Sequence, residues 1–509
     1  MLANVKSSTL MGLSVFEIEI EVDAAGGLPA WDIVGLPDTA VKESKERVRT
    51  AIRNSGFDFP PRRIVVNLAP AHLKKEGPSF DLPIALAILA ATDQLEIEKL
   101  NNIMAVGELG LDGRLRKVNG VLPISLHMAK SDYNLIVPME NGLEGALGGS
   151  STYCFEYLQN VVDFLISLEQ TKPVQAPKLE ELFQNETFLD YDFKNVKGQA
   201  EAKRALEISA AGNHNVLMVG SPGSGKTLLA RCLPGIMPTL TFEECLDITK
   251  IYSISGLLPS QQPIINQRPF RAPHHSASQA SIIGGGRIPT PGEVSLSYHG
   301  VLFMDEFPEF PKDVLEALRQ PLEEGKVTVS RVAAQLTYPA KFLLVSAMNP
   351  CPCGYYGDLI KECTCTPYMA QKYRNKVSGP LLDRIDLHLE IPRLEFQQLQ
   401  SEALEEDSAT IRQRVERARL IQLERFKKMS IFTNSEMKTQ DVRKFCNLKN
   451  ESKDLLKQAF DKLGFTARAH DRIIKVARTI ADLDAKEQID IQHLAEAIQY
   501  RSLDRKIWD

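Results

Sequence analysis

A glycine-rich stretch that follows an apolar segment carries the clearest chemical signal in the sequence. Residues 220–227 fit the pattern G-x-x-x-x-G-K-[ST], the phosphate-binding loop known as Walker A. Glycines let backbone N–H groups close around phosphate oxygens, and the helix that follows points its positive dipole end at them. We therefore expect ATP and Mg²⁺ to bind at Gly220, Ser221, Pro222, Gly223, Ser224, Gly225, Lys226 and Thr227. Lys226 would reach the β- and γ-phosphates, and Thr227 would hold the Mg²⁺.

Two acidic residues follow a second apolar stretch. Residues 300–306 read Gly-Val-Leu-Phe-Met-Asp-Glu, which is typical of a buried parallel strand that ends in two carboxylates. We expect Asp305 to complete the Mg²⁺ site with Thr227, and Glu306 to polarise the attacking water as a general base. A plain surface turn can carry the same pair, but the position after a phosphate-binding loop favours catalysis.

Four of the eight cysteines are clustered within fifteen residues. Cys351, Cys353, Cys363 and Cys365 follow the pattern C-x-C-x₉-C-x-C. Four thiolates can hold Zn²⁺ in a tetrahedral site, although the usual knuckle spacing is C-x₂-C. Isolated loop thiols are the alternative interpretation. We favour a structural Zn²⁺, and we interpret the four scattered cysteines as buried thiols of a reducing compartment.

Length and composition define the class of protein that has to position these residues. A chain of 509 residues is too long for one hydrophobic core, so two to four domains are expected. Its 43% hydrophobic and 25% charged residues are ordinary for a globular protein. The N-terminus lacks a signal-peptide pattern, and the most apolar run, residues 82–92, is too short to span a bilayer, so we expect a cytoplasmic protein. A net charge of −5 excludes a uniformly basic nucleic-acid binder, but not a ring with a basic channel.

The N-terminal 170 residues show a mixture of strand and helix periodicities, which predicts an α+β domain. Apolar and acidic residues alternate over 16–22, as in a half-buried strand. Helical spacing over 38–54 presents a basic face that either meets nucleic acid or is solvated. Further strands are expected at 63–68, 103–107 and 134–138, and an apolar helix at 82–92.

Beyond a proline-containing linker at 171–188, the sequence predicts an α/β core at 189–395 and a helical region at 396–509. Apolar strands are expected directly before the phosphate-binding loop, at 300–304 and at 342–348. Residues 326–338 alternate in two runs and predict a β-hairpin with basic residues near its tip. His274 and His275, on a proline-flanked loop, are further candidates to contact a ligand. Helices are expected at 178–183, 314–324, 394–406, 408–428, 452–463, 467–482 and 491–501.

The order of these motifs resembles AAA+ ATPases of the clade that holds magnesium chelatase and the MCM helicases. The hairpin is similar to the pre-sensor-1 hairpin of that clade, which grips DNA in helicases, so Arg331 and Lys326 are the candidate DNA contacts. Asn349 matches sensor 1, which contacts the γ-phosphate or the lytic water. Arg384 matches the arginine finger that enters a neighbouring subunit's site, which implies a ring; a salt bridge to Asp383 or Asp386 is the structural alternative.

The resemblance extends to both flanking regions. Arg468 matches sensor 2 of the helical lid, with Arg472 as a competitor one turn later. In the N-terminal domain, the Gly-Pro-Ser turn that ends at Ser79 resembles a Lon-protease-like (S5 domain 2-like) domain, in which that serine is the nucleophile. The activating lysine of that family corresponds to the region of Leu122, where no lysine stands. We therefore expect no peptidase activity, and we expect Ser79 to cap the helix that follows.

Taken over nearly the whole chain, these motifs resemble the YifB/ComM family, often labelled magnesium-chelatase-like. The resemblance implies an α/β multidomain protein with an N-terminal Lon-like domain, a P-loop AAA+ core and a C-terminal helical lid. It implies a homo-oligomeric ring, hexameric by family, that uses ATP to drive DNA branch migration during recombination or natural transformation. From the composition we expect no membrane partner. Two alternatives remain: an ATPase that remodels a protein partner, as in magnesium chelatase, and an ATP-dependent protease.

Overall fold

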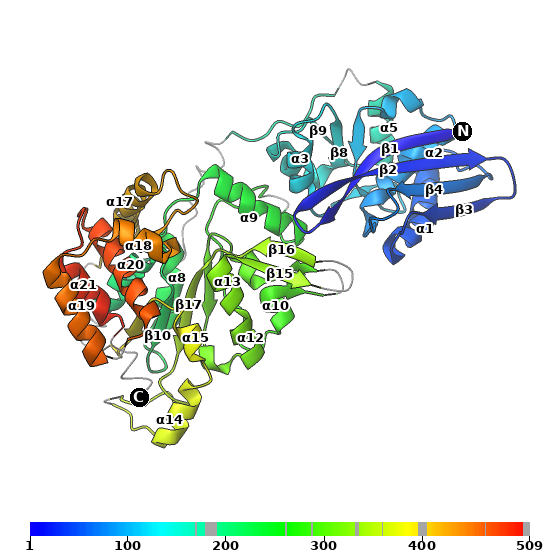
Figure 1. The fold of residues 1–509 in the computed structure, drawn as a ribbon. Coiled ribbons are helices and arrows are strands. Elements are labelled where there is room, and N and C mark those ends of the chain that lie inside the picture. Colours follow the sequence, from blue (N-terminus) through cyan, green and yellow to red (C-terminus); the bar gives the residue numbers. More distant parts are fainter. Residues whose placement is uncertain are drawn as a thin grey trace. The chain divides into compact units, whose positions relative to one another are not determined.

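The chain folds into two compact units, shown in the computed structural model of Figure 1. The structure describes residues 1–167, 171–178, 191–259, 262–286, 289–330, 335–358, 360–394, 405–463 and 465–501. The first unit comprises Met1–Glu186 and Phe242–Asn266, and the second comprises Thr187–Thr241 and Gln267–Asp509. Within these described ranges no helix has the length and apolar character needed to cross a membrane.

A seven-stranded mixed sheet forms the centre of the first unit, in the order β3-β4-β2-β1-β5-β8-β9. Its long antiparallel pair, β1 and β2, runs in register from Leu2 opposite Asp23 to Met11 opposite Ser14. The alternation predicted over residues 16–22 is confirmed, because Ile18, Ile20 and Val22 are fully buried on one face. The strands are β1 Leu2–Met11, β2 Ser14–Ala25, β3 Ala30–Val34, β4 Arg63–Ala69, β5 Ile103–Ala105, β8 Asn134–Pro138 and β9 Thr152–Phe155.

Helix α2, Asp81–Ala91, is buried along its whole length. It contacts β1 and β2 on one side and helix α1, Thr39–Asn54, on the other, which explains why its sequence is apolar all round. Helix α1 begins where predicted, with Asp38 as N-cap accepting a hydrogen bond from the backbone N–H of Val41 at 2.8 Å. The unit is completed by α3 Val121–Met128, α4 Gly142–Leu147 and α5 Leu158–Ile166.

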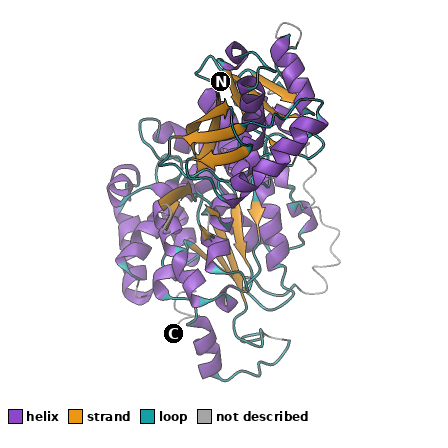
Figure 2. Cartoon of the chain, turned by 90° about the vertical axis from the view of Figure 1, so that its right-hand side faces the viewer, coloured by secondary structure: helices purple, strands orange, loops and turns teal. Residues whose placement is uncertain are grey.

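The second unit is built on a five-stranded sheet in the order β11-β14-β17-β10-β18, in which every neighbouring pair is parallel. Its central strands are fully buried, as expected for a parallel sheet covered on both faces, and Figure 2 shows helices on both sides of its strands. The predicted strands before the phosphate-binding loop, at 300–304 and at 342–348 are thereby confirmed. The strands are β10 Val216–Val219, β11 Phe270–Arg271, β14 Val301–Met304, β17 Leu343–Met348 and β18 Leu387–Glu390.

The C-terminal helices pack against the helices of this sheet. Helix α17, Ser408–Arg425, contacts α7, Ala200–Gly212, and α8, Lys226–Ile236, while α20, Ala467–Leu483, contacts α7 and α17. The helices predicted at 408–428, 452–463, 467–482 and 491–501 are confirmed to within a few residues. The remaining helices of the unit are α10 Gln279–Ile283, α11 Glu293–Leu296, α12 Lys312–Ala317, α13 Arg319–Glu324, α14 Pro367–Arg374, α15 Gly379–Leu382, α18 Thr439–Phe445, α19 Asn450–Leu463 and α21 Ile491–Gln499.

The predicted hairpin is formed by β15, Lys326–Ser330, and β16, Gln335–Pro339. Lys326 pairs with Pro339 at the open end of the hairpin, so the prediction that this basic residue lies near the tip is wrong. The other candidate DNA contact, Arg331, lies outside the described residues. The predicted helix at 178–183, most of the linker at 171–188 and the boundary at 395–396 also fall wholly or largely outside them.

A helix that follows α8 in the chain belongs to the first unit rather than the second. Helix α9, Phe242–Ile254, packs on α3. The backbone carbonyl of Ser253 accepts a hydrogen bond from the N–H of Gly120 at 3.2 Å, and its hydroxyl donates to the buried Glu144 at 2.5 Å. Lys117 Nζ donates to the carbonyl of Leu258 at 2.7 Å. The predicted core at 189–395 is therefore interrupted by a segment that folds onto the N-terminal unit.

A buried ion pair connects α1 to the start of α2. Asp81 is fully buried and accepts hydrogen bonds from Arg47 at 2.8 and 3.1 Å and from the N–H of Leu109 at 3.3 Å. Burial raises the pKa of the Asp81 carboxyl to about 6, although Arg47 opposes that shift. Arg47 is thus half-buried and committed to Asp81, so it is not part of a freely solvated basic face.

Replacing Arg47 by Met leaves the Asp81 carboxylate buried without its cation, so we expect a loss of about 3–5 kcal/mol of stability at pH 7.5. The folded pKa of about 6 lies above the unfolded value, so the folded protein takes up this proton as the pH falls through 6. Without Arg47 the folded Asp81 holds its proton to a still higher pH, so the loss should be largest well above pH 6 and should shrink as the pH falls below about 6, where both folded proteins hold Asp81 protonated. Hydrogen exchange of the α2 backbone amides in the full chain measures this loss of stability. Exposed Lys42, on the same helix, provides the control Lys42→Met; an equal effect of both changes would contradict the pairing.

Candidate functional site

The sheet of the second unit brings the predicted catalytic residues to one edge. Strands β14, β17 and β10 are adjacent and parallel, so their carboxyl ends lie side by side. Asp305 directly follows β14, Asn349 directly follows β17, and Gly220 directly follows β10. Ligands of open parallel sheets bind in the crevice outside such carboxyl ends. Three segments far apart in the sequence therefore meet at one place.

The phosphate-binding loop depends on glycine at two positions. A Cβ at Gly220 would lie 2.4 Å from the carbonyl oxygen of Ile391, so no side chain fits there. Gly225 has φ +92° and occupies the N-cap position of α8, a conformation that other residues rarely adopt. The loop thus turns tightly from β10 into an eleven-residue helix, with the helix N-terminus at the loop.

Lys226 is the first residue of α8, and its ammonium group lies over the loop. The Nζ atom donates to the carbonyl oxygens of Gly220 at 2.6 Å and Ser221 at 3.0 Å, and to Asn349 Oδ1 at 3.3 Å. Burial lowers the pKa of this ammonium group, while the nearby Asp305 opposes the shift. The structure thereby places the predicted phosphate-contacting lysine beside the predicted sensor asparagine.

The two predicted Mg²⁺ ligands are in direct contact. Thr227 Oγ1 donates to Asp305 Oδ2 at 3.0 Å, so a hydroxyl and a carboxylate offer adjacent oxygen atoms. Oxygen ligands of this kind suit Mg²⁺, and the pair fits the group that a phosphate-binding loop implies. Glu306 follows with φ +51°, unusual for a residue with a side chain and typical of functional positions. Its backbone N–H donates to Asp305 Oδ1 at 2.9 Å, which holds the two acids in a fixed relation.

His275 contacts Glu306, a pairing that the sequence did not reveal. The imidazole Nδ1 lies 3.0 Å from Glu306 Oε2, and the ring of His274 packs on that of His275 with centroids 4.1 Å apart. The contact arises because β11, which precedes this loop, is the neighbour of β14 in the sheet. The histidine pair was visible as a ligand candidate, but only the strand order identifies its partner.

Arg384, the predicted arginine finger, is buried in the described chain and paired within its own subunit. Its guanidinium forms an ion pair with Glu323 and donates to the carbonyl of Pro380. The sequence suggested a salt bridge from Arg384 to Asp383 or Asp386 as the alternative. A salt bridge is present, but its acidic partner is Glu323, so the predicted partners are wrong. Asp386 is engaged elsewhere, because it accepts from His214 at 3.1 Å and from Arg472.

The two arginines considered for sensor 2 have different surroundings. Arg472, on α20, is committed to the buried Asp386. The side chain of Arg468 is 64% exposed, and its nearest acid, Asp383, lies 4.0 Å away. Of the two, Arg468 thus keeps a guanidinium that can reorient towards a ligand, as the prediction requires.

The four clustered cysteines converge, as the spacing predicted. Their Sγ atoms all lie within 4.8 Å of one another, a group that can hold a metal ion. Cys351 stands two residues after Asn349 and is fully buried, while the other three are half-buried. The cluster is therefore attached to the same strand end as the sensor asparagine.

Ser79, at the serine position of the N-terminal domain, does not cap the helix that follows it. Ser79 lies in a short turn, Pro78–Phe80, and Phe80 rather than Ser79 occupies the N-cap position of α2, without a side-chain hydrogen bond. The prediction that Ser79 caps this helix is wrong because the turn shifts the helix start by one residue. Leu122 stands where Lon-protease-like domains have their activating lysine, and it is fully buried on α3.

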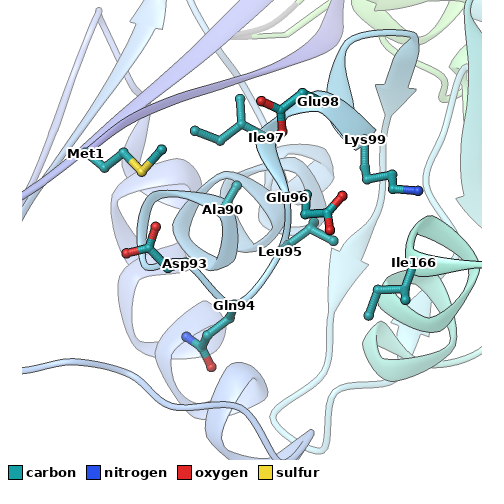
Figure 3. A pocket seen from close by; sticks show the side chains of 10 residues that line it. All are labelled: Met1, Ala90, Asp93, Gln94, Leu95, Glu96, Ile97, Glu98, Lys99 and Ile166. Carbon is teal, nitrogen blue, oxygen red and sulfur yellow. The ribbon is translucent and has the colours of Figure 1, made fainter.

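A hollow of about 440 Å³ in the first unit offers a second place for a ligand (Figure 3). The side chains of Asp93 and Lys99 extend to opposite sides of it in that view, so its polar groups do not converge. Such an arrangement lacks the focused polar contacts of a specific ligand site. It is lined by Met1, Ala90, Asp93, Gln94, Leu95, Glu96, Ile97, Glu98, Lys99 and Ile166.

Comparisons with known proteins match nearly the whole chain. A family model described as magnesium chelatase, subunit ChlI, matches residues 192–399; a second, subunit ChlI of Mg-chelatase, matches 20–141; and the ChlI C-terminal model matches 405–501. The chain is 44% identical over 509 residues to the uncharacterized protein YifB of Escherichia coli and to the competence protein ComM of Haemophilus influenzae. Each alignment covers 99% of this chain and 98% of the relative. The magnesium-chelatase 38 kDa subunit of Rhodobacter capsulatus is 23% identical over 178 residues, which is 31% of this chain and 50% of that subunit.

Proposed function

Because the chain belongs to the YifB/ComM family of magnesium-chelatase-like proteins, we propose that it is an ATP-driven AAA+ motor that forms a ring and translocates DNA. One observation carries the ATPase part of this proposal. Lys226, Thr227, Asp305 and Asn349 meet at one edge of a parallel sheet, linked by hydrogen bonds of 3.0 and 3.3 Å. Glu306 stands directly beside them.

In the proposed reaction, each residue has a separate task. The loop N–H groups and Lys226 bind the β- and γ-phosphates, and Asn349 orients the γ-phosphate or the attacking water. Glu306 accepts the proton of that water. His275 holds the Glu306 carboxylate at 3.0 Å and so acts as a positioning residue. A Mg²⁺ held by Thr227 and Asp305 would neutralise charge on the phosphates.

The proposed site is completed by a neighbouring subunit, and this implies a closed ring, hexameric by analogy with the family. Arg384 would stabilise the charge that develops on the transferred phosphoryl group of the adjacent subunit. To reach it, the guanidinium has to leave its ion pair with Glu323, whose side chain is 53% exposed. Glu323 loses little on separation because water hydrates its exposed carboxylate, whereas the buried Arg384 guanidinium has to exchange this ion pair for the phosphate of the adjacent subunit.

DNA is the proposed substrate of the motor, with branch migration during recombination or transformation as the proposed outcome. Support comes from the name of the competence protein ComM, which is 44% identical over the full length. The hairpin β15–β16 buries Val327, Val329 and Tyr338 on one face and leaves the other exposed. Lys326 is exposed at the base of the hairpin, and Arg331, which lies outside the described residues, remains a proposed contact. The eight free thiols fit a reducing compartment such as the cytoplasm.

A second function, remodelling of a protein partner, is favoured by a different observation. The descriptions of all three matching family models name the ChlI subunit of magnesium chelatase. In that case the same ATPase site would work on a polypeptide, and DNA would leave its turnover unchanged. The response of ATP hydrolysis to DNA therefore separates the two functions.

The first prediction for this site concerns its two central residues. Lys226→Ala should abolish turnover by removing the phosphate-binding cation, and it should weaken nucleotide binding. Glu306→Gln should abolish turnover while nucleotide binding persists, because the amide keeps the shape but cannot accept a proton. Phosphate release and equilibrium binding of a labelled nucleotide measure the two effects. Glu309→Gln, at an exposed acid three residues away, is the matched control and should turn over normally.

A mixing experiment tests the composite site. Arg384→Ala and Glu306→Gln should each lower ATP turnover by about three to five powers of ten. In mixed rings, an intact Glu306 can face an intact Arg384 from the other variant at about a quarter of the interfaces. Activity should therefore reappear on mixing at a comparable fraction of the wild-type rate. If mixtures stay as inactive as their components, Arg384 does not act across an interface.

The DNA assignment is tested with the wild-type chain. Single-stranded or branched DNA should stimulate ATP hydrolysis, and the protein should move a branch point in an ATP-dependent migration assay. Arg331→Ala and Lys326→Ala should reduce the stimulation but leave hydrolysis without DNA unchanged. Hydrolysis that is indifferent to DNA, together with no branch migration, would favour the protein-remodelling function instead.

A further inference from the structure

The cysteine cluster has the dimensions of a mononuclear metal site. Three of its Sγ–Sγ distances are 3.3, 3.5 and 3.7 Å, between Cys351, Cys353 and Cys363. Four sulfurs at 2.3 Å from a tetrahedral Zn²⁺ lie about 3.8 Å apart. A disulfide would require about 2.05 Å, and an iron–sulfur cluster inserts several ions among its thiolates and spreads them farther. The observed separations therefore suit one ion at the centre of four sulfurs.

The loop between the two Cys pairs lies against the phosphate-binding loop. Asp358 Oδ2 accepts a hydrogen bond from Ser221 Oγ at 2.7 Å and forms an ion pair with Arg393 at 3.3 Å. The backbone of Gly354 packs on Pro222, since a Cβ on Gly354 would lie 2.6 Å from the proline ring. Two residues of this loop, Gly354 and Asp358, thus contact the phosphate-binding loop.

Polar and ring contacts, rather than a buried apolar cluster, hold the described part of this loop: Asp358 accepts from the N–H groups of Ile360 and Lys361, and Arg374 lies over the ring of Tyr356. Cys351 is anchored at the end of β17, and Cys365 stands just before α14, but the intervening residues Tyr356 and Ile360 are exposed. A loop without a core of its own loses conformational entropy when it is ordered, and a metal that ties its two ends offsets that loss. The four cysteines stand where such a tie acts on the whole loop.

We propose that Cys351, Cys353, Cys363 and Cys365 bind one Zn²⁺, and that this metal holds the loop whose Asp358 and Gly354 support the phosphate-binding loop. The ion is structural, because all four of its coordination positions are filled by the protein. Metal occupancy thereby controls nucleotide affinity from outside the nucleotide site. The second part of this proposal rests on ATP binding at residues 220–227.

Metal analysis tests the site without any reference to activity. The full chain, purified without chelators, should contain one zinc per subunit by mass spectrometry, and the cobalt-substituted protein should show the absorption bands of a tetrahedral thiolate site. Cys363→Ser should lose both signals, whereas Cys154→Ser, which removes a thiol elsewhere, should keep them. Wild-type protein without bound metal, with iron and sulfide, or with a disulfide in the cluster would overturn the proposal.

Nucleotide affinity tests the connection to the phosphate-binding loop. Asp358→Asn should keep its zinc but bind nucleotide about tenfold more weakly, because it weakens a charge-assisted hydrogen bond to Ser221. Asp313→Asn, at an exposed acid on α12, should bind as the wild type does. Unchanged affinity in both Asp358→Asn and zinc-depleted protein would disprove the supporting role. If the wild type binds zinc but no nucleotide at all, the ATPase proposal fails while the metal site stands.

Discussion

Hydrogen bonding between the parallel strands β14, β17 and β10 is the constraint on which the candidate site depends. Val216 stands opposite Val345, and Leu343 stands opposite Val301, so the three strand ends are fixed relative to one another. A shift of one residue in either pairing would turn the buried side chains of a strand towards the wrong face. Because both faces of these strands are buried, the fit of individual side chains against the covering helices specifies the register. The contact between Thr227 and Asp305 at 3.0 Å follows from it.

A buried network joins the C-terminal helices to this sheet. Burial opposes ionisation of Asp386, but Arg472 and His214 outweigh it and hold the pKa of this carboxyl well below its usual range. His214 in turn shares a hydrogen bond of 2.8 Å with Thr479 of α20. The carboxylate is thus satisfied from two elements, the segment before β10 and helix α20, which is the condition for a stable buried charge. Arg472 is thereby paired with Asp386, while Arg468 one turn earlier is exposed.

The chain connects its two units more than once. It leaves the first unit near residue 186, returns to it at Phe242 and leaves again after Asn266. Within the first unit, α9 is held by the hydrogen bonds of Ser253 with Gly120 and Glu144 rather than by apolar contact alone. Since α9 follows α8 in sequence, the helix that begins at Lys226 is joined by a short segment to a helix of the other unit.

The sequence by itself determined those features whose signal is local. The phosphate-binding loop, the acidic strand end at Asp305 and the amphipathic C-terminal helices were predictable because their patterns repeat within a few residues. Strand β1 was missed because buried Ser7 and Ser8 interrupt its apolar pattern, and the exposed edge strand β3 has no buried face to reveal it.

Only the tertiary structure decided which distant groups meet. It paired Glu306 with His275 through the order of neighbouring strands, and it gave Arg384 the partner Glu323, 61 residues away, instead of a sequence neighbour. It also brought Asp358 to Ser221 across 137 residues. Such contacts are set by chain crossing and sheet order, and no local pattern of residue types encodes them.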